Sequence, residues 1–287
     1  MTPEKTRQIV NKYSFRVKKG YGQHFLIDEH VKAKIINACE LTKDDFVIEI
    51  GPGIGSLTEA LAGRAGKVCA IEIDGGLIPI LAETLADYEN VEIINNDALK
   101  TDINEIIKKS GMKSVKVAAN LPYNIATAVI TELLGKRYPI ETITVMVQKE
   151  VAERLMAGPG TKNYSSLSLF IQYYSEPFLV ANVPVNSFVP RPNVDSAVVR
   201  LNVRKKPPEC AMAANGELLF KIIRAAFAHR RKTLVNCLAD ENIEKDELER
   251  ILCGIGLSKQ IRGEAMSLED FARLAVEIGK REEINYN

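Results

Sequence analysis

The stretch that decides the fold is Phe46-Val47-Ile48-Glu49-Ile50-Gly51-Pro52-Gly53-Ile54-Gly55. It joins an apolar run, interrupted only by Glu49, to a glycine-rich segment, and a helical pattern follows from Ser56 to about Arg64. This order predicts a strand, a tight turn and a helix. The glycines let the backbone approach a ligand closely, with helix amide groups facing it. Nicotinamide and flavin enzymes use similar turns, but their fingerprint would have a third glycine where this chain has Ser56.

Acidic side chains follow the next two predicted strands at the point where each strand ends. A strand over Val68–Ile73 contains Glu72, and a strand over Val91–Ile94 runs into Asn95-Asn96-Asp97. Glu72 and Asp74 lie about the right distance after the first glycine for a carboxylate to reach the hydroxyl groups of a ribose. Asp97 could bind the amino group of an adenine. Either acid alone could be a helix cap, but two acids at one glycine-rich crevice favour contact with a nucleoside.

A polar turn, Asn120-Leu121-Pro122-Tyr123, ends the apolar run Val115–Ala119. The side-chain oxygen of Asn120 and the main-chain carbonyl of Leu121 could hold the two hydrogens of an adenine N6 amino group and make that nitrogen more nucleophilic. Pro122 would stiffen the turn, and Tyr123 could stack on an unpaired base. These groups suit methyl transfer to the exocyclic amine. The alternative is a tight strand-to-helix turn with a buried Tyr.

The order of the predicted elements indicates the fold class. A fifth strand over Thr142–Val147 completes a β-α-β-α-β-α-β-α-β order, which predicts a doubly wound, mostly parallel α/β sheet. Strand patterns return over Phe178–Asn182 and Ser196–Val203 and predict an antiparallel edge. After the linker Arg204-Lys205-Lys206-Pro207-Pro208, helical periodicity dominates. The sequence therefore predicts an α/β domain followed by a small all-helical domain.

Phe188 lies between the last two predicted strands, on a loop stiffened by Pro190 and Pro192. Its ring could cover the second face of a base that stacks on Tyr123. It could equally fill the core of the domain, and the local sequence leaves both interpretations open.

Residues 16–27 combine basic residues, two glycines and aromatic residues ahead of a helix predicted over Asp28–Cys39. Asp28 is the expected N-cap of that helix. The segment could fold over a ligand as a lid, with Gln23 and His24 as its polar contacts. A lone His is more often an ordinary surface or core residue, so composition alone assigns no role to His24.

Charge is distributed unevenly along a chain whose net charge is only +1. Residues 1–24 contain six basic residues and one acid, and His229-Arg230-Arg231-Lys232 forms a second basic cluster. Both segments are candidate phosphate contacts, with solvated surface as the alternative. A nucleic-acid surface, if present, must be local.

The composition, with 46% apolar and 26% charged residues, is that of an ordinary globular protein. The five cysteines have no CxxC or His-linked spacing, so we interpret them as structural residues of a reducing compartment and expect no metal. No apolar run approaches the length of a membrane span, and the basic start lacks a signal-peptide core. We therefore expect a cytoplasmic protein, and a monomer because no heptad pattern or unused apolar face is evident.

Taken together, these motifs resemble the small-subunit ribosomal RNA adenine N6,N6-dimethyltransferases, a family of enzymes that use S-adenosylmethionine (AdoMet). The resemblance spans nearly the whole chain. Its motifs are Gly22-Gln23-His24-Phe25-Leu26, Glu49-Ile50-Gly51-Pro52-Gly53, Glu72-Ile73-Asp74, Asn96-Asp97-Ala98, Asn120-Leu121-Pro122-Tyr123-Asn124, Phe188-Val189-Pro190-Arg191-Pro192 with Val194-Asp195-Ser196-Ala197-Val198-Val199, and Phe227 through Arg230-Arg231-Lys232-Thr233-Leu234.

The resemblance implies a Rossmann-like methyltransferase sheet and dimethylation of two adjacent adenines near the 3′ end of small-subunit ribosomal RNA, with a role in subunit assembly. It implies three regions: a basic arm or lid at 1–27, a methyltransferase domain at 28–203 and a helical RNA-binding domain at 204–287. The expected AdoMet contacts are His24 and Leu26 at its border, Gly51 under its methionine part, Glu72 at its ribose, Asp97 at its adenine and Asn120 between it and the target base. Tyr123 and Phe188 would sandwich that base.

One residue departs from the family pattern, because the family usually has Asn where this chain has His24. A main-chain contact would survive that change, whereas a side-chain contact would become pH dependent. The alternatives are a large-subunit ribosomal RNA methyltransferase of the macrolide-resistance type and a ribosome-assembly or transcription factor on the same fold. A small-molecule methyltransferase would explain neither the basic arm nor the helical region.

Overall fold

The structure is a computed structural model that describes residues 4, 8–9, 12–13, 23–239 and 244–285. Contacts divide the chain into two compact units, Met1–Ala152 with Pro177–Val203, and Glu153–Glu176 with Arg204–Asn287. We expected one domain over 28–203. The unit boundary after Val203 coincides with the expected linker, but Glu153–Glu176 groups with the C-terminal helices because its apolar side chains pack in their core.

Strands and helices alternate along the first unit. In the described residues they are β1 (Phe25–Leu26), α2 (Glu29–Cys39), β2 (Asp45–Ile50), α3 (Ser56–Ala62), β3 (Lys67–Glu72), α4 (Ile78–Thr84), β4 (Val91–Asn95), α5 (Ile103–Ser110), β5 (Ser114–Asn120), α6 (Ala126–Gly135), β6 (Thr142–Gln148), the start of α7 (Lys149–Met156), most of β7 (Ser175–Val183), β8 (Phe188–Val189) and β9 (Ser196–Val203).

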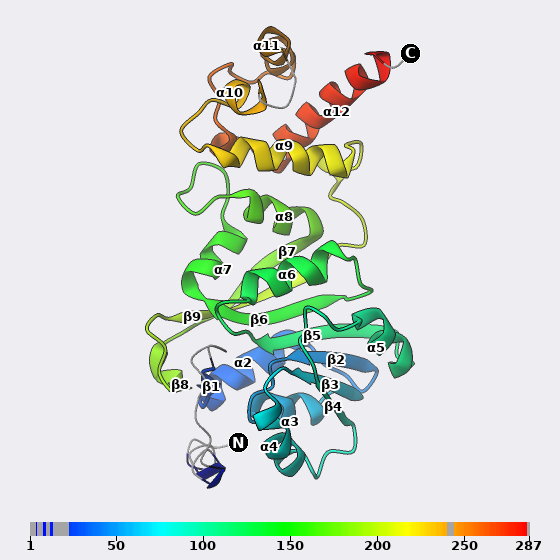
Figure 1. Cartoon of the computed structure of the whole chain (residues 1–287), viewed down its shortest axis with the longest axis vertical. Coiled ribbons are helices and arrows are strands. Elements are labelled where there is room, and N and C mark those ends of the chain that lie inside the picture. Colours follow the sequence, from blue (N-terminus) through cyan, green and yellow to red (C-terminus); the bar gives the residue numbers. More distant parts are fainter. Residues whose placement is uncertain (1–3, 5–7, 10–11, 14–22, 240–243, 286–287) are drawn as a thin grey trace. The chain divides into compact units, whose positions relative to one another are not determined.

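The described residues form a seven-stranded sheet in the order β4-β3-β2-β5-β6-β9-β7 (Figure 1). The strands from β4 to β6 are parallel, whereas β9 runs antiparallel to β6. The predicted doubly wound, mostly parallel sheet with an antiparallel side is therefore confirmed. The chain moves outward from β2 through β3 to β4, and then from β5 to β6 in the opposite direction. A crevice is expected where that order reverses, at the carboxyl ends of β2 and β5.

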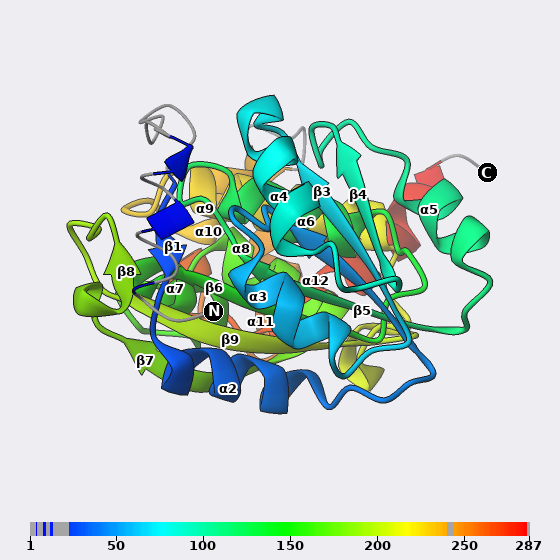
Figure 2. The same cartoon turned by 90° about the horizontal axis from the view of Figure 1, so that it is seen from below.

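Helices α2 and α3 cover one face of this sheet (Figure 2). Helix α2 begins as predicted, because the Asp28 side chain accepts hydrogen bonds from the amides of His30 and Val31. Apolar side chains of both helices share a core cluster with every second residue of the central strands, and its members include Val31, Ile35, Leu57, Leu61, Val47, Val68 and Ala118.

A smaller sheet, absent from the sequence-based prediction, joins two distant segments. Strand β1 pairs antiparallel with β8, with Phe25 opposite Val189 and Leu26 opposite Phe188. Two-residue strands have no detectable periodicity, which explains why the pairing was missed. The pairing ties the last part of the predicted lid, residues 25–26, to the proline-rich loop.

The second unit is helical. Its described elements are the end of α7, then α8 (Ser166–Tyr174), α9 (Gly216–Ala228), α10 (Leu234–Leu238), α11 (Lys245–Gly254) and α12 (Leu268–Asn285). Buried residues of α9 and α12, including Leu219, Ile223 and Phe271, share its core, and the buried Tyr164 hydroxyl donates to the Met266 carbonyl at 2.9 Å. The predicted helical C-terminal region is confirmed. None of the helices in the described residues is both long and apolar enough to cross a membrane.

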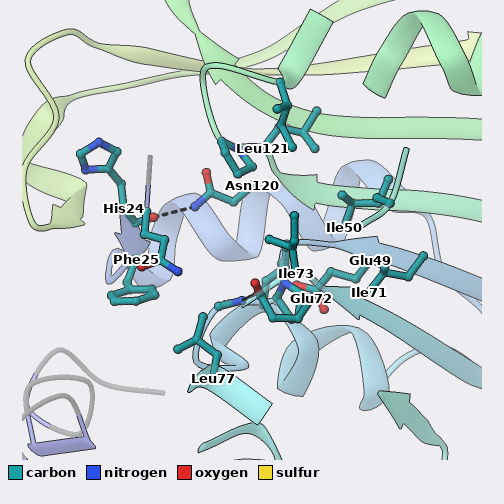
Figure 3. Close-up of a pocket in the computed structure, with 18 of the residues that line it drawn as sticks. His24, Phe25, Glu49, Ile50, Ile71, Glu72, Ile73, Leu77, Asn120 and Leu121 are labelled. Carbon is teal, nitrogen blue, oxygen red and sulfur yellow. Dashed lines mark hydrogen bonds between the residues drawn. The ribbon is translucent and has the colours of Figure 1, made fainter. Parts of the chain in front are cut away.

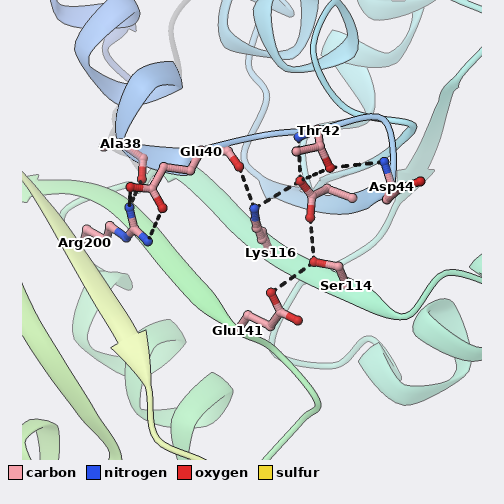
Figure 4. A network of polar contacts seen from close by, with 9 residues as sticks. Ala38, Glu40, Thr42, Asp44, Ser114, Lys116, Glu141 and Arg200 are labelled. Carbon is pink, nitrogen blue, oxygen red and sulfur yellow. Dashed lines mark hydrogen bonds and ion pairs between the residues drawn. The ribbon is translucent and has the colours of Figure 1, made fainter.

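A buried polar network lies at the amino ends of β2 and β5 (Figure 4). The Asp45 carboxylate is 3.1 Å from the Lys116 ammonium and also accepts hydrogen bonds from Ser114 and Thr42. Lys116 donates in addition to the Glu40 carbonyl at 2.8 Å. Burial alone would raise the pKa of Asp45, but these hydrogen bonds hold it below its usual value. The two buried charged groups of this network, Asp45 and Lys116, therefore both have partners.

Replacing Lys116 by Met should destabilise the protein by about 3 kcal/mol, because it leaves the Asp45 carboxylate buried without its cation. The loss should shrink as the pH falls below the ordinary Asp pKa and through the lowered pKa of folded Asp45, because the protonated carboxyl group no longer needs a cation. Urea denaturation of the full chain measures the effect. Lys109→Met is the matched control, since its ion pair with Glu105 is exposed and should matter little. Equal effects of the two substitutions would contradict this account.

Candidate active site

A cavity of about 310 Å³ opens at the carboxyl ends of β2, β3 and β5, where the strand order predicts a crevice (Figure 3). Its volume falls at the lower end of the range for small-molecule sites. The structure brings every predicted site residue except Phe188 to this cavity, namely His24, Leu26, Gly51, Glu72, Asp97, Asn120, Leu121, Pro122 and Tyr123.

The glycine turn after β2 forms one wall of the cavity. Gly51 and Gly53 have φ values of +71° and +62°, a backbone conformation that favours glycine. A Cβ atom on Gly51 would lie 3.7 Å from the Pro122 ring, and one on Gly53 would lie 3.1 Å from the Phe25 ring. The turn is thus packed between β1 and the turn after β5, so a side chain at either glycine would strain the backbone.

Glu72 lies at the carboxyl end of β3 and is only 4% exposed. Its two carboxyl oxygens accept hydrogen bonds from the main-chain amides of Gly53 at 3.2 Å and Asp74 at 2.9 Å. Burial raises the pKa of Glu72 above its usual value, and these hydrogen bonds oppose the rise. The carboxyl group is therefore held in one orientation beside the glycine turn.

Asp97 follows β4 and lines the same cavity. One carboxyl oxygen accepts a hydrogen bond from the Leu99 amide at 3.0 Å, so the acid also stabilises its own turn. Apolar side chains accompany it at the cavity, where Ile73 is 46% and Leu99 is 38% exposed. Sequence reasoning missed these two residues, because the exposure of an apolar side chain depends on tertiary packing. Together they offer apolar surface beside a hydrogen-bond acceptor.

The Asn120 side chain has a defined orientation (Figure 3). Its amide nitrogen donates to the main-chain carbonyl of His24 at 2.8 Å, so the amide oxygen faces away from that carbonyl. The Leu121 amide donates to the Met146 carbonyl, and the Pro122 carbonyl accepts from Ile125 and Ala126. These bonds fix the backbone on both sides of the Leu121 carbonyl.

Tyr123 and His24 lie together at the edge of the cavity. The Tyr123 hydroxyl is 2.7 Å from the Ser196 hydroxyl, and the two rings have centroids 5.5 Å apart. Burial raises the pKa of Tyr123, so the phenol is protonated at neutral pH. The His24 Nδ1 lies 2.8 Å from the Pro190 carbonyl and must carry the hydrogen, because a carbonyl only accepts. His24 thus contacts the site through its main chain and holds the proline-rich loop through its side chain. Residues 16–22 of the predicted lid lie outside the described residues.

Phe188 does not line the cavity in this structure. The side chain is 1% exposed and belongs to the core cluster that includes Leu26 and Val31. Of the two interpretations that the sequence left open, the structure shows the core position, because pairing of β8 with β1 turns the ring inward. The expectation that Phe188 lies against a bound base is therefore not met here.

Glu49 is a cavity residue to which sequence reasoning gave no role, although an acid inside an apolar strand was the available signal. It is 1% exposed, and its Oε2 atom has no hydrogen-bond partner among the described residues. Burial raises the pKa of Glu49 to about 8, and the negative charge of Glu72 contributes in the same direction. At neutral pH this carboxyl group is therefore mostly protonated.

Glu49→Gln should flatten the pH dependence of stability. Between the usual Glu pKa and about 8, folded Glu49 keeps a proton that the unfolded chain releases. Wild-type stability should therefore fall as pH rises through this window, by at most about 1.4 kcal/mol per pH unit from this group. Urea denaturation between pH 5 and 8 measures the slope of the free energy of unfolding against pH for the wild-type protein and for the variant. The contribution of Glu72 to this slope is common to both proteins. Identical slopes would show that Glu49 is ionised in the folded state.

The doubly wound sheet, the glycine turn and the turn after β5 define the class of Rossmann-like methyltransferases. No group of three or more His, Cys, Asp or Glu side chains within the described residues could hold a metal ion. Residues 14–279 match the family model described as ribosomal RNA adenine dimethylase. The chain belongs to the ribosomal RNA adenine dimethylase family, and it is a methyltransferase. The family and enzyme class predicted from the motifs are confirmed.

Curated relatives match almost end to end. The chain is 52% identical over 278 residues to the ribosomal RNA small subunit methyltransferase A of Lachnoclostridium phytofermentans, with 95% of each chain covered. It is 49% identical over 280 residues to the protein of the same name from Geobacillus sp., with 96% of each covered.

Two solved structures have a similar fold. A dimethyladenosine transferase from Plasmodium falciparum has a TM-score of 0.77 and 28% identity, covering 90% of this chain and 98% of its own. The 23S rRNA methyltransferase ErmE has a TM-score of 0.69 and 28% identity, covering 87% of this chain and 97% of its own. The fold is therefore similar to those of enzymes named as a dimethyladenosine transferase and as a 23S rRNA methyltransferase.

Proposed function

We propose that this protein transfers methyl groups from AdoMet to the N6 atoms of two adjacent adenines near the 3′ end of small-subunit ribosomal RNA. The observation that carries this proposal is the Asn120 amide, held by the His24 carbonyl with its oxygen available to a substrate amine. The family, and relatives named for the small ribosomal subunit, support the choice of RNA. The substrate form would be an immature small subunit in the cytoplasm, bound by a monomer.

The cavity suits AdoMet. Gly51 and Gly53 leave room for a ligand against the backbone, as expected for the methionine part, and Glu72 would accept hydrogen bonds from ribose hydroxyls. Asp97 would accept from the adenine amino group, while Ile73 and Leu99 would cover the ring. His24 and Leu26 would border the cofactor. Bound AdoMet supplies a methyl group on a positively charged sulfur, which makes that methyl group electrophilic.

Asn120 and Leu121 would prepare the adenine amino group for attack. Their oxygens accept hydrogen bonds from the two N6 hydrogens, and these bonds weaken delocalisation of the nitrogen lone pair into the ring. The methylated nitrogen then loses a proton to water, so no strong general base is needed in the site. Tyr123, anchored through Ser196, would stack on the base and hold it beside Asn120 at a gain of roughly 1–3 kcal/mol. An unpaired adenine suits this arrangement, because the base must leave its stack to enter the cavity.

Basic side chains of the second unit would contact RNA phosphates. His229, Arg230, Arg231 and Lys232 are exposed, and Arg230 is held by Glu264 at 3.3 Å and by the Lys162 carbonyl at 3.1 Å. Arg231 and Lys232 therefore present cations beside an ordered Arg. The basic N-terminal arm, mostly outside the described residues, would add to this contact, and both would support subunit assembly.

Mass spectrometry of nucleosides and RNA fragments tests the proposed function. Undermethylated small subunits are incubated with the full chain and AdoMet, and we expect dimethyladenosine at two neighbouring positions near the 3′ end of the RNA. Methylation of large-subunit RNA alone would favour the activity named for the similar ErmE structure. AdoMet binding without methylation of either RNA would favour an assembly factor.

Asn120→Ala should abolish methyl transfer in this assay, since the amide oxygen that accepts an N6 hydrogen is lost. AdoMet affinity should change much less, because Glu72, Asp97 and the glycine turn remain. Calorimetry with AdoMet and single-turnover transfer separate the two effects. Wild-type transfer by the variant would refute the role given to Asn120.

Arg231→Glu combined with Lys232→Glu should weaken RNA binding and reduce the slope of log affinity against log salt by about 1–2, because phosphate contacts are lost. Filter binding of a small-subunit RNA fragment at several salt concentrations measures both quantities. The matched control is Lys113→Glu, an exposed residue that precedes β5 at the amino edge of the sheet. Unchanged binding and slope in the double variant would place the RNA contact elsewhere.

A further inference from the structure

Glu49 lies in the central strand of the cavity floor, on the same face of the sheet as Glu72 and Asn120 (Figure 3). The strand register pairs Glu49 with Ala70 of β3 and with Ala118 of β5. Side chains two residues apart on a strand point to the same face. Glu72 is two residues after Ala70, and Asn120 is two residues after Ala118. Both side chains therefore lie on the same face as Glu49, on its two sides and nearer the carboxyl ends of the strands.

No cation contributes to the pKa of Glu49, and only the Thr58 hydroxyl of α3 opposes the larger effect of burial. The titratable groups that face it are Glu72 of β3 and Cys39 of α2, and neither is a cation. Its Oε2 atom has no hydrogen-bond partner in the described part of the chain. An ionised, fully buried carboxylate in such a place is strongly disfavoured unless an opposite charge arrives. A cationic group of a ligand in the cavity would supply that opposite charge.

We propose that Glu49 is the counter-ion of the positively charged methionine end of the methyl donor, and that it releases its proton to solvent when that ligand binds. This inference rests on the proposed use of AdoMet. The methionine end has two cationic groups, the sulfonium and the α-ammonium, and one carboxylate. The glycine turn expected to hold it begins two residues after Glu49. A charge pair at a buried carboxyl group is stronger than one in water.

If the sulfonium is the partner of Glu49, the site distinguishes donor from product by charge. AdoMet has one more positive charge than S-adenosylhomocysteine, the product that remains after methyl transfer. An acid whose ionisation depends on that charge would hold the donor more firmly than the product. A Glu49 with only a structural role would instead stay protonated before and after binding, and no proton would be released.

Titration calorimetry of the full chain at pH 7, in buffers of different ionisation enthalpy, counts the protons released. Wild-type protein should release about one proton on binding AdoMet and none on binding 5′-methylthioadenosine, which has neither cation. S-adenosylhomocysteine has only the ammonium, so its proton release shows which cation pairs with Glu49. The affinity for AdoMet should rise with pH between 6 and 8.

Glu49→Gln should remove both the proton release and the pH dependence, and should weaken AdoMet binding about tenfold, as expected for loss of one charge contact. Its affinity for 5′-methylthioadenosine should not change. Glu72→Gln should weaken all three ligands, because each has a ribose. Glu92→Gln, an exposed acid on β4, is the surface control and should behave as wild type.

AdoMet binding by wild-type protein without proton release would overturn the inference and leave the proposed function intact. The inference would also be overturned if the Glu49→Gln variant bound AdoMet with the affinity and the proton release of the wild-type protein. No AdoMet binding by the wild-type protein would refute the proposed function and the inference with it. The wild-type arm decides the question even if the variant fails to fold.

Discussion

The parallel alignment of β2, β3 and β5 is the constraint on which the site depends. It places the carboxyl ends of three segments, distant in sequence, at one edge of the sheet. The glycine turn follows β2, Glu72 is the last residue of β3, and the turn after β5 begins at the last residue of that strand, Asn120. Since the strand order reverses between β2 and β5, the helices that follow them leave room for a crevice there. A shift of the register by one residue would turn Glu72 or Asn120 to the opposite face.

Buried acids at the two ends of the same sheet differ in whether they have partners. At the amino end, Asp45 has Lys116, Ser114 and Thr42 as partners, so the network stabilises the fold. At the carboxyl end, Glu49 is equally buried but faces another acid, and its Oε2 atom has no partner within the described residues. Such a group destabilises the ligand-free protein and is expected where a ligand completes the site. The proposed counter-ion role would link the stability lost at Glu49 to ligand binding.

Much of the fold could be predicted from residue patterns. The continuous apolar strands, the glycine turn and the N-cap at Asp28 are local signals, and the structure has them where they were expected. The acids at strand ends could be placed in the site because parallel strands share an edge. The grouping of Glu153–Glu176 with the C-terminal helices could not be predicted, since an amphipathic helix does not identify its partner. The β1–β8 pairing could not be predicted either. The buried position of Phe188 therefore could not be predicted, because this pairing decides which way its ring turns.

A crystal structure of the protein with S-adenosylhomocysteine tests the central claim most directly, because it shows whether one crevice serves cofactor and target base together. We predict that the ribose hydroxyls contact Glu72, that the methionine part lies along the glycine turn near Glu49, and that the sulfur faces the Asn120 amide oxygen. A ligand whose ribose lies away from Glu72, or whose sulfur is turned from Asn120, would contradict the account.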